Sequence, residues 1–62
     1  MRVGIAGYGV VGKKRYSSII KNTSFIVTDI SEVNATARDE IPDGINVFNN
    51  YQDLILKADL DI

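Results

Sequence analysis

The chain has 62 residues, a formal net charge of −1, and neither cysteine nor histidine. This length allows one small domain, and the missing residue types exclude disulfides and the nitrogen and sulfur ligands that zinc prefers. The near-neutral charge gives no electrostatic reason to expect a nucleic acid or an anionic membrane as partner. With no signal-peptide pattern and no apolar run near the roughly 20 residues of a membrane span, we expect a cytoplasmic protein.

The first predicted element is a strand over residues 2–6 that leads directly into a glycine-rich turn. Gly7, Gly9 and Gly12 form the pattern G-x-G-x-x-G, and residues 10–21 are predicted to form a helix after it. In this setting the first glycine allows a tight turn, the second leaves room for a pyrophosphate, and the third lets the helix pack closely. The free N–H groups at the start of the helix favour an anion. The pattern therefore predicts a dinucleotide-binding loop.

A continuous apolar run predicts a second strand over residues 25–29, of the kind covered on both faces in a parallel sheet. Asp29 closes this run 22 residues after Gly7, near the roughly 20-residue spacing of the acid that binds the adenosine ribose. A carboxylate accepts hydrogen bonds from the ribose hydroxyls but repels a 2′-phosphate, and Ile30 and Ser31 supply no arginine. We therefore expect NAD rather than NADP. The alternative is that Asp29 only ends the strand or caps the next helix.

The remaining residues predict two more helices and one more strand. Ser31 can cap a short helix over residues 32–39, which a proline-glycine turn ends. Residues 45–48 predict a third strand, after which Asn49 or Asn50 can cap a final helix.

The order β-α-β-α-β-α predicts an α/β fold with parallel strands joined by right-handed crossovers. This is the first half of a Rossmann-like dinucleotide-binding sheet, spanning residues 1–62 and truncated before the fourth strand. Without the second half, one face that includes Val3 and Ile5 would stay partly bare. We therefore expect either a missing C-terminal polypeptide or a homo-oligomer formed through that face.

Three parts of the chain carry a family resemblance: R-V-G-I-A-G-Y-G-V-V-G-K-K-R over residues 2–15, Asp29, and Y-Q-D-L-I-L-K-A-D-L-D-I over residues 51–62. The last part matches an acidic, leucine-containing helix followed by an aspartate pair, here Asp59 and Asp61. Together they resemble the N-terminus of the glucose–fructose oxidoreductase/inositol dehydrogenase (Gfo/Idh/MocA) family, over essentially the whole chain. The resemblance implies an NAD(P)-dependent oxidoreductase acting on a sugar, cyclitol or sugar nucleotide, with its substrate pocket in a second domain.

Members of that family carry a catalytic lysine, and often a histidine, further along the chain, so no catalytic residue is carried over. The alternatives are a regulatory nucleotide-sensing module without chemistry and a half-domain with no independent role. The ring of Tyr8 is expected either to border the cofactor or to point to solvent, and no metal ligands are expected. The predicted cofactor-binding residues are Gly7, Tyr8, Gly9, Val10, Val11, Gly12, Asp29 and Ile30.

Overall fold

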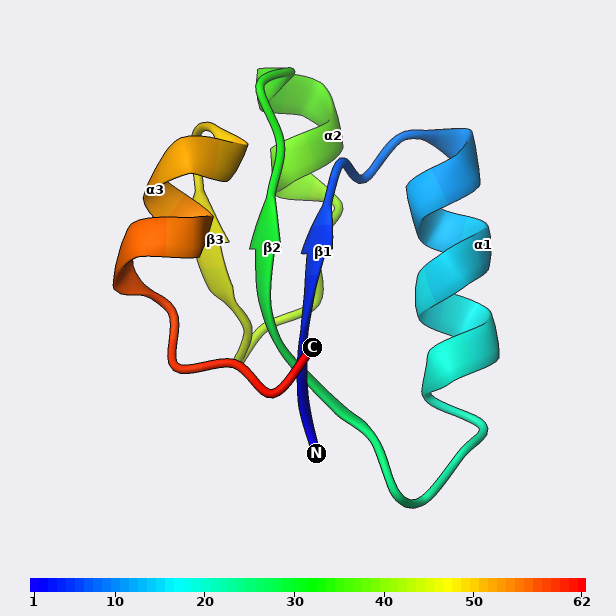
Figure 1. Ribbon diagram of the computed structural model, residues 1–62. Helices are drawn as coiled ribbons and strands as arrows, with labels where there is room; N and C mark the ends of the chain where they lie inside the picture. The colour runs from blue at the N-terminus through cyan, green and yellow to red at the C-terminus, as the bar shows by residue number, and fades with distance from the viewer.

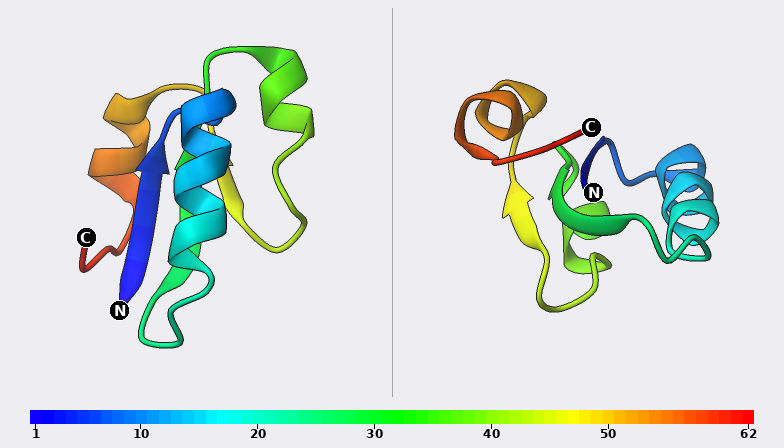
Figure 2. Two further views of the ribbon diagram at one scale, coloured as in Figure 1. Left: turned by 90° about the vertical axis from the view of Figure 1, so that its right-hand side faces the viewer. Right: turned by 60° about the horizontal axis from the view of Figure 1, so that its bottom comes forward.

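The computed structural model describes residues 1–62 and contains a three-stranded parallel sheet with a helix after each strand. The strand order is β1-β2-β3, and α1 and α2 lie on one face of the sheet while α3 covers the other (Figure 1 and Figure 2). The predicted α/β class and the order β-α-β-α-β-α are confirmed. The elements are β1 (Arg2–Ala6), α1 (Val10–Ile19), β2 (Ile26–Ser31), α2 (Ala35–Asp39), β3 (Asn46–Phe48) and α3 (Tyr51–Lys57).

The second strand is longer than the sequence predicted, because β2 continues through Ser31 instead of ending at Asp29. Its register with β1 shifts by one residue, and Thr28 is left without a partner on β1. Such a bulge breaks the strict alternation of side chains between the two faces of a strand. As a result, Val27 and Ile30 both enter the same core, although an uninterrupted strand would send them to opposite faces. Asp29 is therefore an internal residue of the strand.

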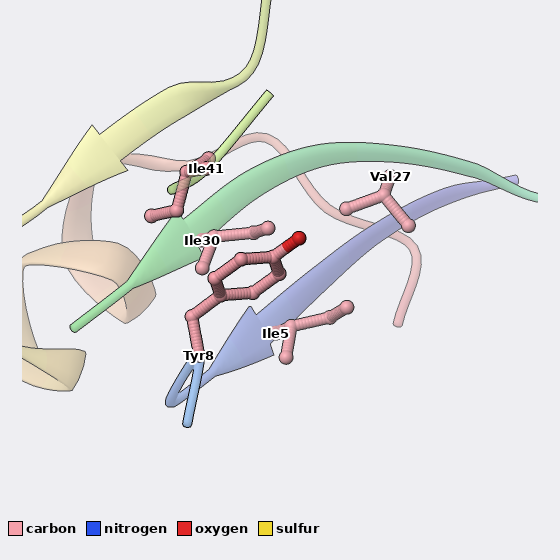
Figure 3. Packing of buried hydrophobic residues seen from close by; sticks show 5 residues of the cluster. All are labelled: Ile5, Tyr8, Val27, Ile30 and Ile41. Carbon is pink, nitrogen blue, oxygen red and sulfur yellow. The ribbon is translucent and has the colours of Figure 1, made fainter. Parts of the chain in front are cut away.

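The main hydrophobic core lies on the face of the sheet that α1 and α2 cover (Figure 2). Figure 3 shows its five buried side chains from close by. The rings of Tyr8 and Tyr16 meet edge to face there, with 6.0 Å between their centroids. Tyr16 and Ile19 bring α1 against this core. The five buried members of the core are Ile5, Tyr8, Val27, Ile30 and Ile41.

The turn between β1 and α1 depends on two of its glycines. Gly7 has a φ angle of 98°, in the left-handed region that side chains disfavour. A Cβ atom on Gly12 would overlap the carbonyl oxygen of Gly7, because the first turn of α1 lies directly against the backbone of the glycine turn. Both positions are glycine for reasons internal to the fold.

The second helix begins later than the sequence predicted. It starts at Ala35 instead of residue 32, and Asn34 caps it by accepting a hydrogen bond from the N–H of Ala37 at 3.0 Å. Ser31 does not cap this helix because it is the last residue of β2 and is almost completely buried. Because β2 continues through Ser31, α2 begins later than predicted.

The expectation of a partly bare sheet face is wrong for Val3 and Ile5, since these residues are only 4% and 5% exposed. Ile5 belongs to the main core, and Val3 shares an apolar hollow with Ile19 of α1 and Ile62. Other apolar residues of the sheet are exposed, with Ile26 of β2 at 62% and Val47 of β3 at 46%, and Leu56 of α3 is 81% exposed. None of the three helices is long and apolar enough to cross a bilayer.

The C-terminal residues run beside the outer edge of β1. The N–H groups of Asp61 and Ile62 donate to the carbonyl of Arg2 at 2.9 and 3.1 Å, and the N–H of Gly4 donates to the carbonyl of Ile62 at 3.0 Å. The Arg2 guanidinium also pairs with the Asp59 carboxylate at 2.8 Å. These bonds bring the two chain ends together at the amino end of β1 (Figure 1).

The different surroundings of Gly12 and Gly9 predict different effects of the same substitution. Gly12→Ala should lower the free energy of unfolding by about 1–3 kcal/mol, because its Cβ forces two backbone segments apart. Gly9→Ala should cost less than about 1 kcal/mol, since its Cβ would meet no atom within 4 Å. Urea titrations followed by circular dichroism compare the two variants. Equal losses of stability would contradict the close contact between α1 and the turn.

Candidate functional site

The carboxyl ends of β1 and β2 meet at one end of the sheet, beside the glycine turn. Ligands of open α/β sheets bind at this end of the strands. An open hollow of about 290 Å³ lies there, between the strand ends and the start of α3. Its lining residues are Ala6, Gly7, Ser31, Glu32, Val33, Asn50 and Tyr51.

No side chain caps the first turn of α1. The residue at the N-cap position is Gly9, which has no side chain to accept a hydrogen bond from the N–H groups of that turn, and the turn contains no acidic residue. The other two helices are capped by Asn34 and Asn50. The first N–H groups of α1 therefore remain available to an anion, in the positive end of the helix dipole.

Gly9 differs from the other two glycines of the motif. Its φ angle of −75° is accessible to any residue, and open space surrounds the position that a Cβ would occupy. The fold itself therefore does not require glycine at this position. The open space lies where the motif predicts the close approach of a pyrophosphate.

Glu32 immediately follows β2 and contacts the glycine turn. Its Oε1 accepts a hydrogen bond from the N–H of Tyr8 at 2.6 Å, and its Oε2 accepts one from the N–H of Asn34 at 2.8 Å. These two bonds, in that order of importance, hold the pKa of the Glu32 carboxyl below its ordinary value, and the charge of Arg38 acts in the same direction. The carboxylate is thus ionised and fixed at the edge of the hollow.

Asp29 lies away from this hollow. It is only 3% exposed and lies beside β3 and α3. Its Oδ1 accepts a hydrogen bond from Asn46 Nδ2 at 3.0 Å, and its Oδ2 accepts one from Thr28 Oγ1 at 2.6 Å. It lines a separate hollow under α3, which Arg2 and Lys57 also border. In this arrangement the carboxylate joins β2 to β3.

The remaining predicted site residues have different exposures. The ring of Tyr8 points into the core and neither borders the hollow nor faces solvent (Figure 3). Tyr8 therefore contributes only its backbone to the surface of the glycine turn. Ile30 is completely buried in the same core and presents no surface to a ligand. Val10 and Val11 are 73% and 61% exposed at the start of α1. The structure therefore brings together Gly7, Gly9 and the exposed first turn of α1.

Sequence reasoning missed Glu32, although one signal for it was present. Ile30 extends the apolar run past Asp29, and a strand that includes Ile30 ends next to Glu32. Glu32 follows Gly7 by 25 residues and Asp29 follows it by 22, so a spacing rule of about 20 does not separate them. Which of the two acids lies beside the glycine turn depends on the residue at which β2 ends.

Comparisons of the chain with models of protein families, with curated proteins and with solved structures found no match. No group of three or more histidine, cysteine, aspartate or glutamate side chains is arranged to hold a metal ion. The candidate site is therefore defined by the glycine turn, the uncapped start of α1 and the carboxylate after β2.

The lowered pKa of Glu32 predicts how stability depends on pH. Because the folded-state pKa is below the ordinary value of 4.5, the stabilising hydrogen bonds are fully present above pH 4.5 and are lost as the pH falls through the folded-state value. The Glu32→Gln variant lacks this titration. Its free energy of unfolding should therefore approach that of the wild type as the pH is lowered from 7 to 3, in urea titrations at each pH. Parallel pH profiles for the two proteins would contradict the contact.

Proposed function

We propose that this chain binds the adenosine diphosphate portion of NAD(H) at the carboxyl ends of β1 and β2. It would do so as the first half of a Rossmann-like sheet, in an oxidoreductase that acts on a sugar, cyclitol or sugar nucleotide. The observation that carries the proposal is the glycine turn. Gly7 and Gly12 are glycine because the fold requires it, whereas Gly9 is glycine where only a ligand would need the space.

The pyrophosphate would lie over Gly9, at the start of α1. The uncapped N–H groups of that turn offer donors to phosphate oxygens, and the absence of an acidic residue there avoids charge repulsion. Val10 and Val11 present exposed apolar side chains at the same place. A phosphate group on this turn would provide the cap that Asn34 and Asn50 provide for the other two helices.

For the adenosine ribose we propose Glu32 in place of Asp29. Glu32 borders the hollow beside the glycine turn, while Asp29 lies in a different hollow and is only 3% exposed. A carboxylate at the end of β2 can accept hydrogen bonds from both ribose hydroxyls. Tyr51 and Val33 line the same hollow and offer apolar surface for the adenine ring.

The same carboxylate favours NAD over NADP, because it would repel a 2′-phosphate. The nearest guanidinium on α2 belongs to Arg38, and its Nη1 donates to the carbonyls of Glu32 and Val33 at 2.9 and 2.8 Å. Arg38 therefore holds the backbone of the turn after β2. With this arginine engaged, we expect the negative charge of Glu32 to decide the preference.

Gly9→Ala provides the test of the pyrophosphate position. The added Cβ would occupy the space of the phosphate, so the affinity for NAD(H) should fall at least about tenfold, which corresponds to about 1.4 kcal/mol. Isothermal titration calorimetry measures the affinity, and circular dichroism shows that the fold is kept. Unchanged affinity in a folded Gly9→Ala protein would mean that no phosphate approaches this turn.

The two carboxylates are distinguished by a comparison of NAD⁺ and NADP⁺ binding. Glu32→Ala should narrow the preference for NAD⁺, whereas Asp29→Asn should keep it, because the new amide can still bond to Asn46 and Thr28 in the sheet. A preference lost with Asp29→Asn and kept with Glu32→Ala would restore Asp29 as the ribose ligand. Tighter binding of NADP⁺ by the wild type would contradict the proposed cofactor.

A further inference from the structure

Glu32 is held in place through its backbone as well as its carboxylate. Its N–H donates to the carbonyl of Phe48 at the end of β3, at 3.0 Å. Its carbonyl accepts a hydrogen bond from Arg38 Nη1 on α2, at 2.9 Å. The side chain therefore extends toward the glycine turn from a backbone position that β3 and α2 both fix.

Two further contacts also hold the glycine turn. The N–H of Gly7 donates to the carbonyl of Ser31 at 2.7 Å, and the ring of Tyr8 is packed in the core. The hydrogen bond from the N–H of Tyr8 to the carboxylate of Glu32 is a third contact, at the residue next to Gly9. A short turn tied at consecutive residues has few alternative conformations left.

We propose that Glu32 is a positioning residue for the glycine turn, which holds the turn in the conformation that receives a pyrophosphate. This role rests on the proposed function and adds to the contact with the ribose. A turn that is already ordered loses less conformational entropy when the ligand binds, so the affinity is higher. The role requires only that Glu32 accepts a hydrogen bond from the N–H of Tyr8.

Electrostatic repulsion alone predicts the opposite effect on affinity when the Glu32 carboxylate is removed. A negative carboxylate next to a phosphate site repels the ligand, so removal of its charge would strengthen phosphate binding. A positioning role predicts weaker binding when the acceptor is removed. Glu32→Gln and Glu32→Ala remove the same charge, but only glutamine keeps an oxygen that can accept from the N–H of Tyr8. The difference between these two variants therefore isolates the hydrogen bond.

The experiment uses the 62-residue chain and two ligands, ADP and 2′,3′-dideoxy-ADP, with calorimetric measurement of both affinities. The dideoxy ligand has no ribose hydroxyls for Glu32 to bind, so any effect on it arises at the phosphates. We expect Glu32→Ala to weaken binding of the dideoxy ligand about tenfold and binding of ADP by more than that, because ADP also loses its ribose contact. Glu32→Gln should restore part of the loss for the dideoxy ligand. The matched charge control is Asp39→Asn, on an exposed residue at the end of α2, which should change neither affinity by more than about twofold.

Amide hydrogen exchange of Tyr8, measured by NMR without ligand, gives a second readout. The Tyr8 amide should exchange fastest in Glu32→Ala, at an intermediate rate in Glu32→Gln and slowest in the wild type. Equal affinities of the two Glu32 variants for the dideoxy ligand, or unchanged Tyr8 exchange, would overturn the positioning role and leave the proposed function standing. Failure of the wild type to bind either ligand would overturn both.

Discussion

Thr28 is an extra residue in β2, and its insertion lets Val27 and Ile30 share the core between the sheet and α1. The same insertion turns Asp29 toward β3 and carries the end of the strand to Ser31. Buried apolar area stabilises a domain this small more than any single polar contact does. The packing of the core therefore decides to which face of the sheet each side chain of β2 after the bulge is directed. The positions of the carboxylates of Asp29 and Glu32 follow from this bulge.

Tyr8 connects this core to the glycine turn. Its ring packs in the core while its backbone N–H faces Glu32, so a single residue links the hydrophobic packing to the conformation of the turn. On the surface, Lys13 of α1 pairs with Glu40 at the end of α2 and lies 5.9 Å from the centroid of the Tyr8 ring. This exposed pair contributes little stability, and the buried ring holds the turn against the sheet.

Two kinds of glycine occur within one motif, and they have different physical causes. Gly7 needs a left-handed backbone, and Gly12 lies against the carbonyl of Gly7, so both belong to the folding of the turn. Gly9 is free of such constraints and instead leaves space outside the fold. The proposed binding of an anionic nucleotide rests on a glycine that the fold does not require, next to an uncapped helix start and an ionised carboxylate.

The sequence by itself determined the order of the elements and the glycine turn, and it limited the cap of α3 to Asn49 or Asn50, because these features depend on residues that are close together in the chain. Tertiary structure decided the end of β2, the burial of the Tyr8 ring and the proximity of Glu32 to the turn. These features depend on the register between β1 and β2. An apolar run shows that a strand exists, but only pairing with a neighbouring strand shows where a bulge falls and to which face each later side chain is directed.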